Sequence, residues 1–360
     1  MQSNTVPPNT ANVAEVAIVI VGFRNPEDIV ACLRALSHAT DQPGFDIFIC
    51  ENGGVDAFDR LSRELVEGAD PCCAAEGAPV ELRASQFFKI RQMRFRTRSS
   101  RVWVGAACEN LGYAGGINAW LKPLASLRGW KGIWILNPDT EPEPGALAAL
   151  VQRAEIGNKG MVGSTILDPG CGDLIRFRGG LQWQPLAARA VALGLGERVG
   201  VPHQLTAIEA SMDSPSGASM YVTRSCIQQI GPMDESFFLF FEDLDWGLKA
   251  KEFGLGYASD SIVAHKRGTT TGSAKSLGAL PKLSVYLEHR NAIHFVRKHF
   301  PRTLPIRIVV SLMCAIRFLG VGAPNNFLTA LRGLAAGLRG ETGRPVWHRD
   351  KSFDPSLRLD

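Results

Sequence analysis

Several acidic side chains and one histidine stand at points of the sequence where they could bind a cation and move a proton. Asp139 follows an apolar run in the sequence N-P-D-T, and a carboxylate there suits Mg²⁺ or Mn²⁺ bound together with phosphate oxygens. Glu242, Asp243 and Asp245 follow five apolar residues, F-F-L-F-F. Like charges beside a hydrophobic wall repel and lose solvation, which raises a carboxyl pKa and makes one of them a candidate general base. His265 ends another apolar run and is a candidate metal ligand.

Each of these residues also has a purely structural explanation. Asp139 could cap a following helix, and three acids at a helix N-terminus interact favourably with the helix dipole. His265 could be a hydrogen-bonded core residue, and Glu51, which ends an apolar run in E-N-G-G, could simply form a turn. Single residues therefore do not decide between catalysis and structure, and their order along the predicted elements has to decide.

The elements that must position these residues alternate between strand and helix. Four apolar runs predict strands that are buried on both faces: Val16–Gly22, 45–50, 102–107 and Gly132–Leu136. Amphipathic helices are predicted from Pro26 and over residues 145–154. This alternation predicts an α/β fold with a doubly wound, mainly parallel sheet and right-handed crossovers. Ligands bind beyond the carboxyl ends of such strands, where Glu51, Asp139 and the glycine-rich loop 110–118 fall.

The composition limits the class of protein. The chain has 360 residues, 45% hydrophobic and 21% charged, which is enough apolar material for a large core and excludes disorder, collagen and coiled coil. Its 39 Lys and Arg against 35 Asp and Glu give a net charge of +4, too small for a nucleic-acid binder as a whole. The scattered cysteines, with no C-x-x-C pair, predict reduced core thiols. The polar N-terminus predicts no signal peptide, so we expect a cytosolic protein.

Two stretches, 82–108 and 297–340, carry basic residues without any acid. The first could meet lipid phosphate or be a local insertion. Within the second, the run 306–323 has the length of a membrane span, but Arg307 and Arg317 lie inside it. A pair of interfacial helices, whose arginines reach lipid phosphates while the apolar face enters the acyl boundary, fits better. The alternative, a C-terminal helix packed on the domain with a solvated basic face, stays open.

The order of the motifs resembles the family 2 glycosyltransferases of the GT-A fold, especially the bacterial branch that resembles rhamnosyltransferases. The likeness covers roughly residues 15–300 and rests on a series of short motifs: V-A-I-V-I-V-G-F, I-F-I-C-E-N-G-G, N-L-G-Y-A-G-G-I-N, W-I-L-N-P-D-T, S-G-A-S-M, F-F-L-F-F-E-D-L-D-W, the later A-H and E-H-R-N. Any one motif is weak, whereas all of them in this order and spacing are specific. The resemblance implies a GT-A fold followed by C-terminal amphipathic helices.

The resemblance also implies a role for each matching residue on the donor side. Nucleotide binding is expected of residues that follow the first three predicted strands: Phe23, Arg24, Glu51, Gly112, Gly115, Gly116 and Asn118. Asp139 and His265 resemble the ligands of a divalent cation, Mg²⁺ or Mn²⁺, that bridges the donor diphosphate.

On the acceptor side, Asp243 resembles the base that takes a proton from the acceptor hydroxyl. Binding of the acceptor is expected of its neighbours: Glu242, Asp245 and Trp246. Arg290 and Asn291 match a pair that precedes the family's C-terminal helices.

We therefore expect three parts in the chain. Residues 1–14 form a flexible N-terminus, and 15–300 form the GT-A domain, with a nucleotide-binding half of about 15–160 and an acceptor half of about 161–300. Residues 301–360 form basic amphipathic helices and a tail.

The activity that the resemblance implies is an inverting, metal-dependent transfer of a sugar from a nucleoside diphosphate donor to a glycan or polyprenyl-linked acceptor, in cell-surface polysaccharide synthesis. The expected donor is dTDP-rhamnose, with UDP-sugars, including a galactofuranose donor, as the alternative. Such an enzyme would be cytoplasmic and peripheral to the inner membrane, in contact with anionic lipid, with a homodimer left open and no nucleic-acid partner. A nucleotidyltransferase and a non-catalytic nucleotide- or glycan-binding module stay open as other classes.

Overall fold

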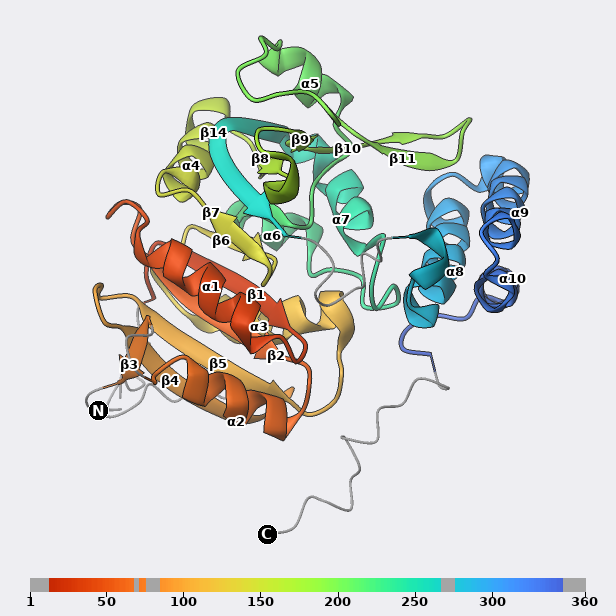
Figure 1. The fold of residues 1–360 in the computed structure, drawn as a ribbon. Helices are drawn as coiled ribbons and strands as arrows, with labels where there is room; N and C mark the ends of the chain where they lie inside the picture. The colour runs from red at the N-terminus through yellow and green to blue at the C-terminus, as the bar shows by residue number, and fades with distance from the viewer. Residues whose placement is uncertain (1–12, 68–70, 76–84, 267–275, 346–360) are drawn as a thin grey trace, which may run out of the picture.

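The computed structural model describes residues 13–67, 71–75, 85–266 and 276–345, so most of the expected N-terminal segment and the end of the tail lie outside the described residues. A sheet of eleven strands runs through the molecule in the order β3-β4-β5-β2-β1-β6-β13-β8-β14-β7, with β9 beside β8 (Figure 1). The strands are β1 (Val16–Gly22), β2 (Phe45–Glu51), β3 (Cys72–Ala74), β4 (Phe87–Phe95), β5 (Arg101–Ala107), β6 (Gly132–Leu136), β7 (Thr140–Pro142), β8 (Met161–Leu167), β9 (Ile175–Arg178), β13 (Ser219–Thr223) and β14 (Leu255–His265).

The centre of this sheet is parallel, as the buried apolar runs predicted. The strands β5, β2, β1 and β6 pair in parallel with one another, and they cover the four runs identified in the sequence. Beyond β6 the sheet becomes mixed, because β13 is antiparallel to both β6 and β8, while β14 and β8 are parallel. The predicted α/β organisation is confirmed, and one continuous sheet joins the two predicted halves.

Helices cover both faces of the sheet, which explains why all seven residues of β1 are buried. Alternate residues of β1 point to opposite faces: Ile18 packs in a core with α1 and α4, and Val19 packs in a second core with α3. The helices of the sheet region are α1 (Pro26–Ser37), α2 (Val55–Glu64), α3 (Gly112–Ser126), α4 (Ala146–Gly157), α6 (Arg224–Ile230) and α7 (Glu242–Ala250).

A smaller sheet and a bundle of helices lie beside the main sheet (Figure 1). The smaller sheet has the order β11-β10-β12, and helix α5 (Leu205–Ser211) lies next to it. Its strands are β10 (Gly180–Gln184), β11 (Arg189–Ala192) and β12 (Ser214–Pro215). The bundle, drawn in blue, consists of α8 (Lys282–His299), α9 (Leu304–Gly320) and α10 (Pro324–Arg339). Because α8 begins at Lys282, the bundle starts inside the segment expected to form the catalytic domain.

The basic stretch 82–108 is a local part of the sheet from residue 85 onward. It contains β4, β5 and the residues that connect them, and the two strands pair antiparallel. Arg101 pairs with Asp46 at 2.6 Å, Lys89 pairs with Asp59 at 3.1 Å, and Arg96 donates to a backbone carbonyl. These contacts favour the interpretation as a local insertion, because these three cations are partnered within the domain.

Candidate active site

A pocket of about 690 Å³ opens at the carboxyl ends of β1 and β6. Its walls come from both halves of the sheet and from the start of α8, which are segments far apart in the sequence. The lining residues are Val21–Phe23, Asn52, Asn110, Gly112, Tyr113, 137–139, Phe177, Leu181, Ala190, 216–218, 238–244, His265, Leu280, Leu283, Ser284 and Glu288. A cleft at this edge of the sheet is where a doubly wound α/β fold binds ligands.

Asp139 and His265 come together in this pocket. Asp139 follows β6 and precedes β7, and β7 pairs with β14 so that His265 lies opposite Thr140. As a result, His265 Nε2 lies 3.1 Å from Asp139 Oδ1, with the side chains 12% and 7% exposed. Helix α4 begins only at Ala146, so Asp139 does not cap it. The helix-cap explanation for Asp139 is therefore wrong, whereas His265 is a largely buried, hydrogen-bonded histidine that also lines the pocket.

The donor set at this point fits a divalent cation. A carboxylate oxygen and an imidazole nitrogen are ligands that Mn²⁺ accepts, and carboxylate oxygen also suits Mg²⁺. The second ring nitrogen of His265, Nδ1, is buried and has no hydrogen-bond partner within the described residues. No group of three or more His, Cys, Asp or Glu side chains gathers at one point in the described part of the chain. The protein therefore offers two ligands here, and a bound cation would keep positions for phosphate oxygens or water.

Glu242 and Asp243 begin α7 and line the same pocket. Asp243 Oδ2 accepts a hydrogen bond from the backbone N–H of Gly217 at 3.2 Å, and Oδ1 accepts one from Leu244 at 2.8 Å. Burial raises the pKa of Asp243, and these backbone hydrogen bonds oppose the rise. Burial and the charge of Asp243 raise the pKa of Glu242, whose Oε2 atom is buried without a partner in the described residues. The raised carboxyl pKa predicted from the sequence is present at both.

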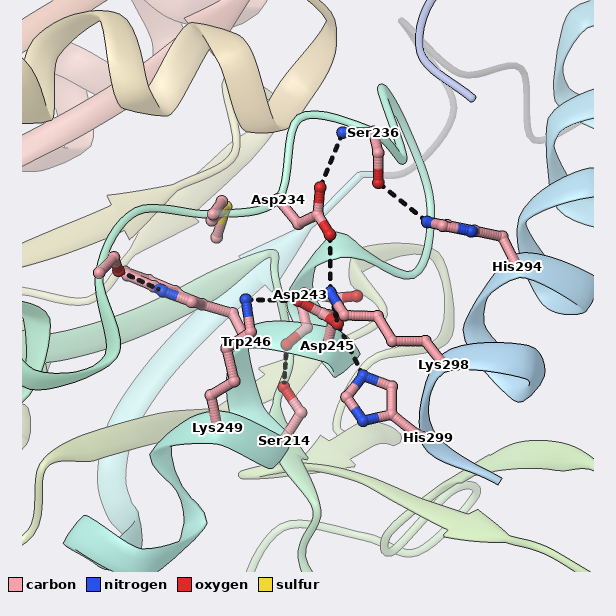
Figure 2. Close-up of polar contacts among 12 residues, drawn as sticks. Ser214, Asp234, Ser236, Asp243, Asp245, Trp246, Lys249, His294, Lys298 and His299 are labelled. Atoms are coloured by element: carbon pink, nitrogen blue, oxygen red, sulfur yellow. Dashed lines mark hydrogen bonds and ion pairs between the residues drawn. The ribbon is translucent and has the colours of Figure 1, made fainter. Parts of the chain in front are cut away.

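Asp245 and Trp246 do not line the pocket, contrary to the expectation that they bind the acceptor. Figure 2 shows Asp245 held by His299 and Lys298 of α8, and both distances are 2.6 Å. Trp246 is fully buried, and its Nε1 donates to the carbonyl of Gly231 at 2.9 Å. The two side chains belong to the packing around α7: Asp245, two positions beyond Asp243, points to a nearly opposite side of the helix, and Trp246 is buried in the core with its indole N–H bonded to Gly231.

Of the residues expected to bind the nucleotide at the ends of β1 and β2, only Phe23 lines the pocket, whereas Arg24 and Glu51 lie beside it without lining it. Phe23 lines the pocket, and the Arg24 guanidinium lies 5.2 Å from the centre of its ring. Glu51 is fully buried, and its Oε1 accepts hydrogen bonds from the backbone N–H of Arg24 at 3.0 Å and of Gly53 at 2.7 Å. Burial raises the pKa of Glu51, and these hydrogen bonds oppose the rise. Its second oxygen, Oε2, has no partner in the described chain.

The glycine-rich loop contributes one of its expected residues directly to the pocket. Gly112 lines the pocket and has φ of +72°, a conformation that glycine adopts without cost. Gly115, Gly116 and Asn118 lie behind it: a Cβ on Gly116 would meet Val21, and Asn118 exchanges hydrogen bonds with the backbone of Met233. These three residues support the loop and do not line the pocket.

Among the pocket residues that the sequence analysis did not assign, Asn52 and Tyr113 hold parts of the pocket together. Asn52 Nδ2 donates to the carbonyl of Gly112 at 2.8 Å, which joins the end of β2 to the glycine-rich loop. Tyr113 Oη lies 2.6 Å from the carbonyl oxygen of Gly217 and 3.0 Å from Asn137 Oδ1, so it joins the two halves of the pocket. Both stand inside motifs that were noticed, E-N-G-G and N-L-G-Y, but their partners lie at least 24 positions away, so the local pattern could not assign their roles.

The curated relatives of this chain include a rhamnosyltransferase and a hexosyltransferase, while no protein-family model matches the chain. One relative is the N-acetylglucosaminyl-diphospho-decaprenol L-rhamnosyltransferase of Mycobacterium tuberculosis, with 28% identity over 181 residues that cover 45% of this chain and 58% of that protein. The other is the low-salt glycan biosynthesis hexosyltransferase Agl10 of Haloferax volcanii, with 22% identity over 244 residues that cover 66% of this chain and 75% of that protein. The chain therefore spans little more than half the length of the first relative.

Solved structures with a similar course of the chain include a mannosyltransferase and a protein in complex with UDP-GlcNAc. The mannosyltransferase PcManGT of Pyrobaculum calidifontis, in complex with GDP-Man and Mn²⁺, has 11% identity and a TM-score of 0.48, with 94% of this chain and 91% of that chain covered. S. aureus TarS residues 1–349, in complex with UDP-GlcNAc, has 11% identity and a TM-score of 0.46, with 91% and 92% covered.

Proposed function

On the premise that this chain is a family 2 glycosyltransferase with rhamnosyltransferases among its relatives, we propose that it transfers a sugar from a nucleoside diphosphate to a hydroxyl group with inversion. The names of two relatives, a rhamnosyltransferase and a hexosyltransferase, support the resemblance that the motifs predicted. The observation that carries the proposal is the common pocket of Asp139, His265 and Asp243. A cation site and a general base facing one cavity are what an in-line displacement at a sugar carbon requires.

The donor nucleoside would bind between Phe23 and Glu51. The Phe23 ring is half-buried and lines the pocket, so it offers an apolar face to a base. Glu51 Oε2 lies beside Gly22, where a Cβ would approach it to 3.0 Å, and Gly22 also lines the pocket. A buried carboxylate oxygen without a partner favours a ligand N–H or hydroxyl donor, because an unsatisfied buried acceptor costs about 1–3 kcal/mol.

Asp139 and His265 would hold the Mg²⁺ or Mn²⁺ ion. When bound, such a cation supplies positive charge that stabilises a departing diphosphate. The chain's own part is to keep the two ligands together, which the pairing of β7 with β14 does.

Asp243 would act as the general base. In the proposed reaction the acceptor O–H gives its proton to the Asp243 carboxylate while the acceptor oxygen bonds to the anomeric carbon, and the bond from that carbon to the diphosphate oxygen breaks. A pKa raised by burial makes this carboxylate a stronger base than an exposed aspartate. Glu242 stands next to it and would bind acceptor hydroxyls through its unpartnered oxygen.

Rhamnose from dTDP-rhamnose is the donor sugar that we propose, with a UDP-hexose as the alternative. The first relative is named a rhamnosyltransferase and the second a hexosyltransferase, and these names support the two choices in turn. The acceptor that we propose is a lipid-linked glycan, because the name of the first relative describes a diphospho-decaprenol acceptor.

A lipid-linked acceptor requires contact with a membrane, and we propose that the outer face of α9 makes it. The helical stretch Pro301–Gly320 is long and apolar enough to cross a membrane by length and composition, yet only 22% of its most apolar window is buried. Val309, Met313 and Ile316 lie on its exposed side and are 56–61% exposed. Residues 289–340 contain no acid, and Arg302, Arg317 and Arg332 are exposed. An exposed apolar stripe among cations fits peripheral binding to anionic lipid at the cytoplasmic face.

The function is tested with the full chain, a panel of nucleotide sugars including dTDP-rhamnose and UDP-hexoses, a polyprenyl-diphosphate GlcNAc acceptor, and Mg²⁺ or Mn²⁺. We expect transfer with inversion, and we expect Asp243→Asn to lower kcat by about 10²- to 10⁴-fold while nucleoside diphosphate binding is kept. Asp173→Asn, at an exposed aspartate paired with Arg198, is the matched control and keeps full activity.

The outcomes separate the candidate classes. Full transfer by Asp243→Asn would contradict the assignment of the base. Binding of nucleotide sugars without transfer from any donor would favour a non-catalytic module, and release of pyrophosphate from a nucleoside triphosphate would favour a nucleotidyltransferase.

The membrane contact is tested by pelleting with vesicles that contain anionic lipid. The wild-type chain is expected to pellet, and Ile316→Glu is expected to weaken the pelleting. Ile156→Glu, at an apolar residue of α4 that is 76% exposed, adds the same charge elsewhere and is expected to pellet like the wild type. Equal loss in both variants would contradict the assignment of the α9 face.

A further inference from the structure

The segment before α7, residues 237–241, adopts a backbone conformation that its sequence does not favour. Phe238, Phe240 and Phe241 have φ of +66°, +72° and +73°, in the left-handed region. Each such residue other than glycine costs about 1–2 kcal/mol. This conformation therefore persists only because surrounding contacts impose it. The segment forms a wall of the pocket and leads directly into Glu242 and Asp243.

Asn291 of α8 supplies the contacts that impose this conformation. Its side chain is fully buried, and Nδ2 lies 2.7, 2.8 and 3.0 Å from the carbonyl oxygens of Phe237, Leu239 and Phe240. Arg290, its neighbour, also donates to the Phe237 carbonyl at 3.1 Å. The Asn291 amide therefore pairs three backbone carbonyl groups that would otherwise be buried without this donor.

Asp245 attaches the other side of the same region to α8. Its side chain is fully buried and lies within hydrogen-bonding distance of His299 Nε2, at 2.6 Å (Figure 2). It also forms ion pairs with Lys298 Nζ at 2.6 Å and with Lys249 Nζ at 3.0 Å. Lys298 also pairs with Asp234 at 2.6 Å. Two lysine ammonium groups and one imidazole therefore surround this buried carboxylate, and its contacts with Lys298 and His299 tie the first turn of α7 to the last turn of α8.

We propose that Asn291 and Asp245 are positioning residues through which α8 sets the place and direction of Asp243. Asp243 stands between the two attachments, two residues after Phe241 and two before Asp245. Asp243 accepts a hydrogen bond from Gly217 N–H at its carboxylate and one from Ser214 Oγ at its backbone carbonyl. These two contacts attach Asp243 to β12 and to the loop after β12, and α8 restrains the segment from the other side. The inference rests on the proposed role of Asp243 as the base.

The test is a double-mutant cycle between Asp245→Asn and Asp243→Asn. Asp245→Asn keeps the shape of the side chain and removes its charge. In the wild-type background we expect it to lower kcat by about 10- to 100-fold, as a displacement of the base by a fraction of an ångström to one ångström would. In the Asp243→Asn background we expect a change of less than about twofold, because the group it positions is already gone. The dissociation constant of a nucleoside diphosphate is expected to stay unchanged.

Glu209→Gln is the matched control. Glu209 is also a buried carboxylate with two cationic partners, Arg153 and Lys159, but it lies on α5 and does not line the pocket. We expect it to keep kcat even where it lowers thermal stability. If Asp245→Asn lowered kcat equally in both backgrounds, or no more than Glu209→Gln does, the positioning role would be overturned.

Two further measurements keep the inference falsifiable. Should Asp245→Asn not fold, His299→Ala removes one of its donors, and His299→Gln, whose amide can still donate, is expected to restore part of kcat. Hydrogen exchange of residues 237–247 is expected to rise in Asn291→Ala and in Asp245→Asn, and unchanged exchange in both would overturn the attachment. If the wild-type chain transferred no sugar at all, the proposed function would fail instead, and the exchange measurement would still decide the attachment.

Discussion

Gly112 offers a prediction whose magnitude follows from the structure. Its φ of +72° costs an alanine about 1–2 kcal/mol. A Cβ at this position would overlap the carbonyl oxygen of Phe238 and come within 2.5 Å of its ring carbon Cδ2. The same carbonyl accepts a hydrogen bond from Tyr113 N–H at 2.7 Å, so the backbone cannot move aside without weakening it. Gly112→Ala is therefore expected to lose on the order of 3 kcal/mol of unfolding free energy.

Two other glycines separate the sources of this loss. Gly231→Ala carries only the conformational cost, because Gly231 has φ of +74° and its Cβ would meet nothing within 4 Å. Gly145→Ala carries neither cost, because Gly145 has φ of −86° at the start of α4 and open space around it. We expect about 1 kcal/mol of loss at Gly231 and a neutral or slightly stabilising effect at Gly145.

The assay is thermal and denaturant unfolding of the three variants, together with calorimetric binding of a nucleoside diphosphate. Gly112→Ala is expected to bind the nucleotide more weakly than the wild type, because the displaced loop lines the pocket, whereas the other two variants bind normally. A Gly112→Ala variant as stable as Gly231→Ala would refute the overlap with Phe238. Unchanged nucleotide binding would refute the place of this loop in the donor site.

Three further predictions concern charged groups. Glu51→Gln replaces the unpartnered carboxylate oxygen by either an amide donor or a weaker acceptor, and we expect about 10- to 100-fold weaker nucleoside diphosphate binding by calorimetry. The cationic partners of Asp245 hold its pKa below the ordinary value against the opposing effect of burial, so its stabilisation is present at neutral pH and is lost as the pH falls. The difference in unfolding free energy between the wild type and Asp245→Asn is thus expected to narrow below about pH 4. Chelation of divalent cations is expected to abolish transfer and Mn²⁺ to restore it, with Asp139→Asn raising the concentration needed, because one of the two protein ligands is lost.

The strands and their order along the chain could be predicted from the sequence because buried runs are a local signal. Each of the four central strands is an apolar run bounded by polar or glycine residues, and each appears within a residue or two of its expected bounds. The position of Glu51 and Asp139 at strand ends follows from the same signal. In a parallel sheet the carboxyl ends of the strands lie at one edge, so both residues were expected at that edge.

The roles of the acids in E-D-L-D-W could not be predicted from their closeness in sequence. Residues two apart on a helix point in nearly opposite directions, so Asp243 lines the pocket while Asp245 faces α8. Asp245 contacts Lys298 and His299 of α8, and both of these residues lie more than fifty positions away in the sequence. A local pattern therefore shows that acids are present and leaves open which of them meets a ligand.

By itself, the sequence determined the elements and the kinds of chemical group that stand at their ends, because hydrophobic burial and turn formation depend on near neighbours. Only the tertiary structure decided which groups meet. Asp139 and His265 are 126 positions apart, and they touch because β14 pairs with β7 in one register. A shift of that register by one residue would turn His265 to the other face of the sheet, and no local pattern in the chain contains that choice.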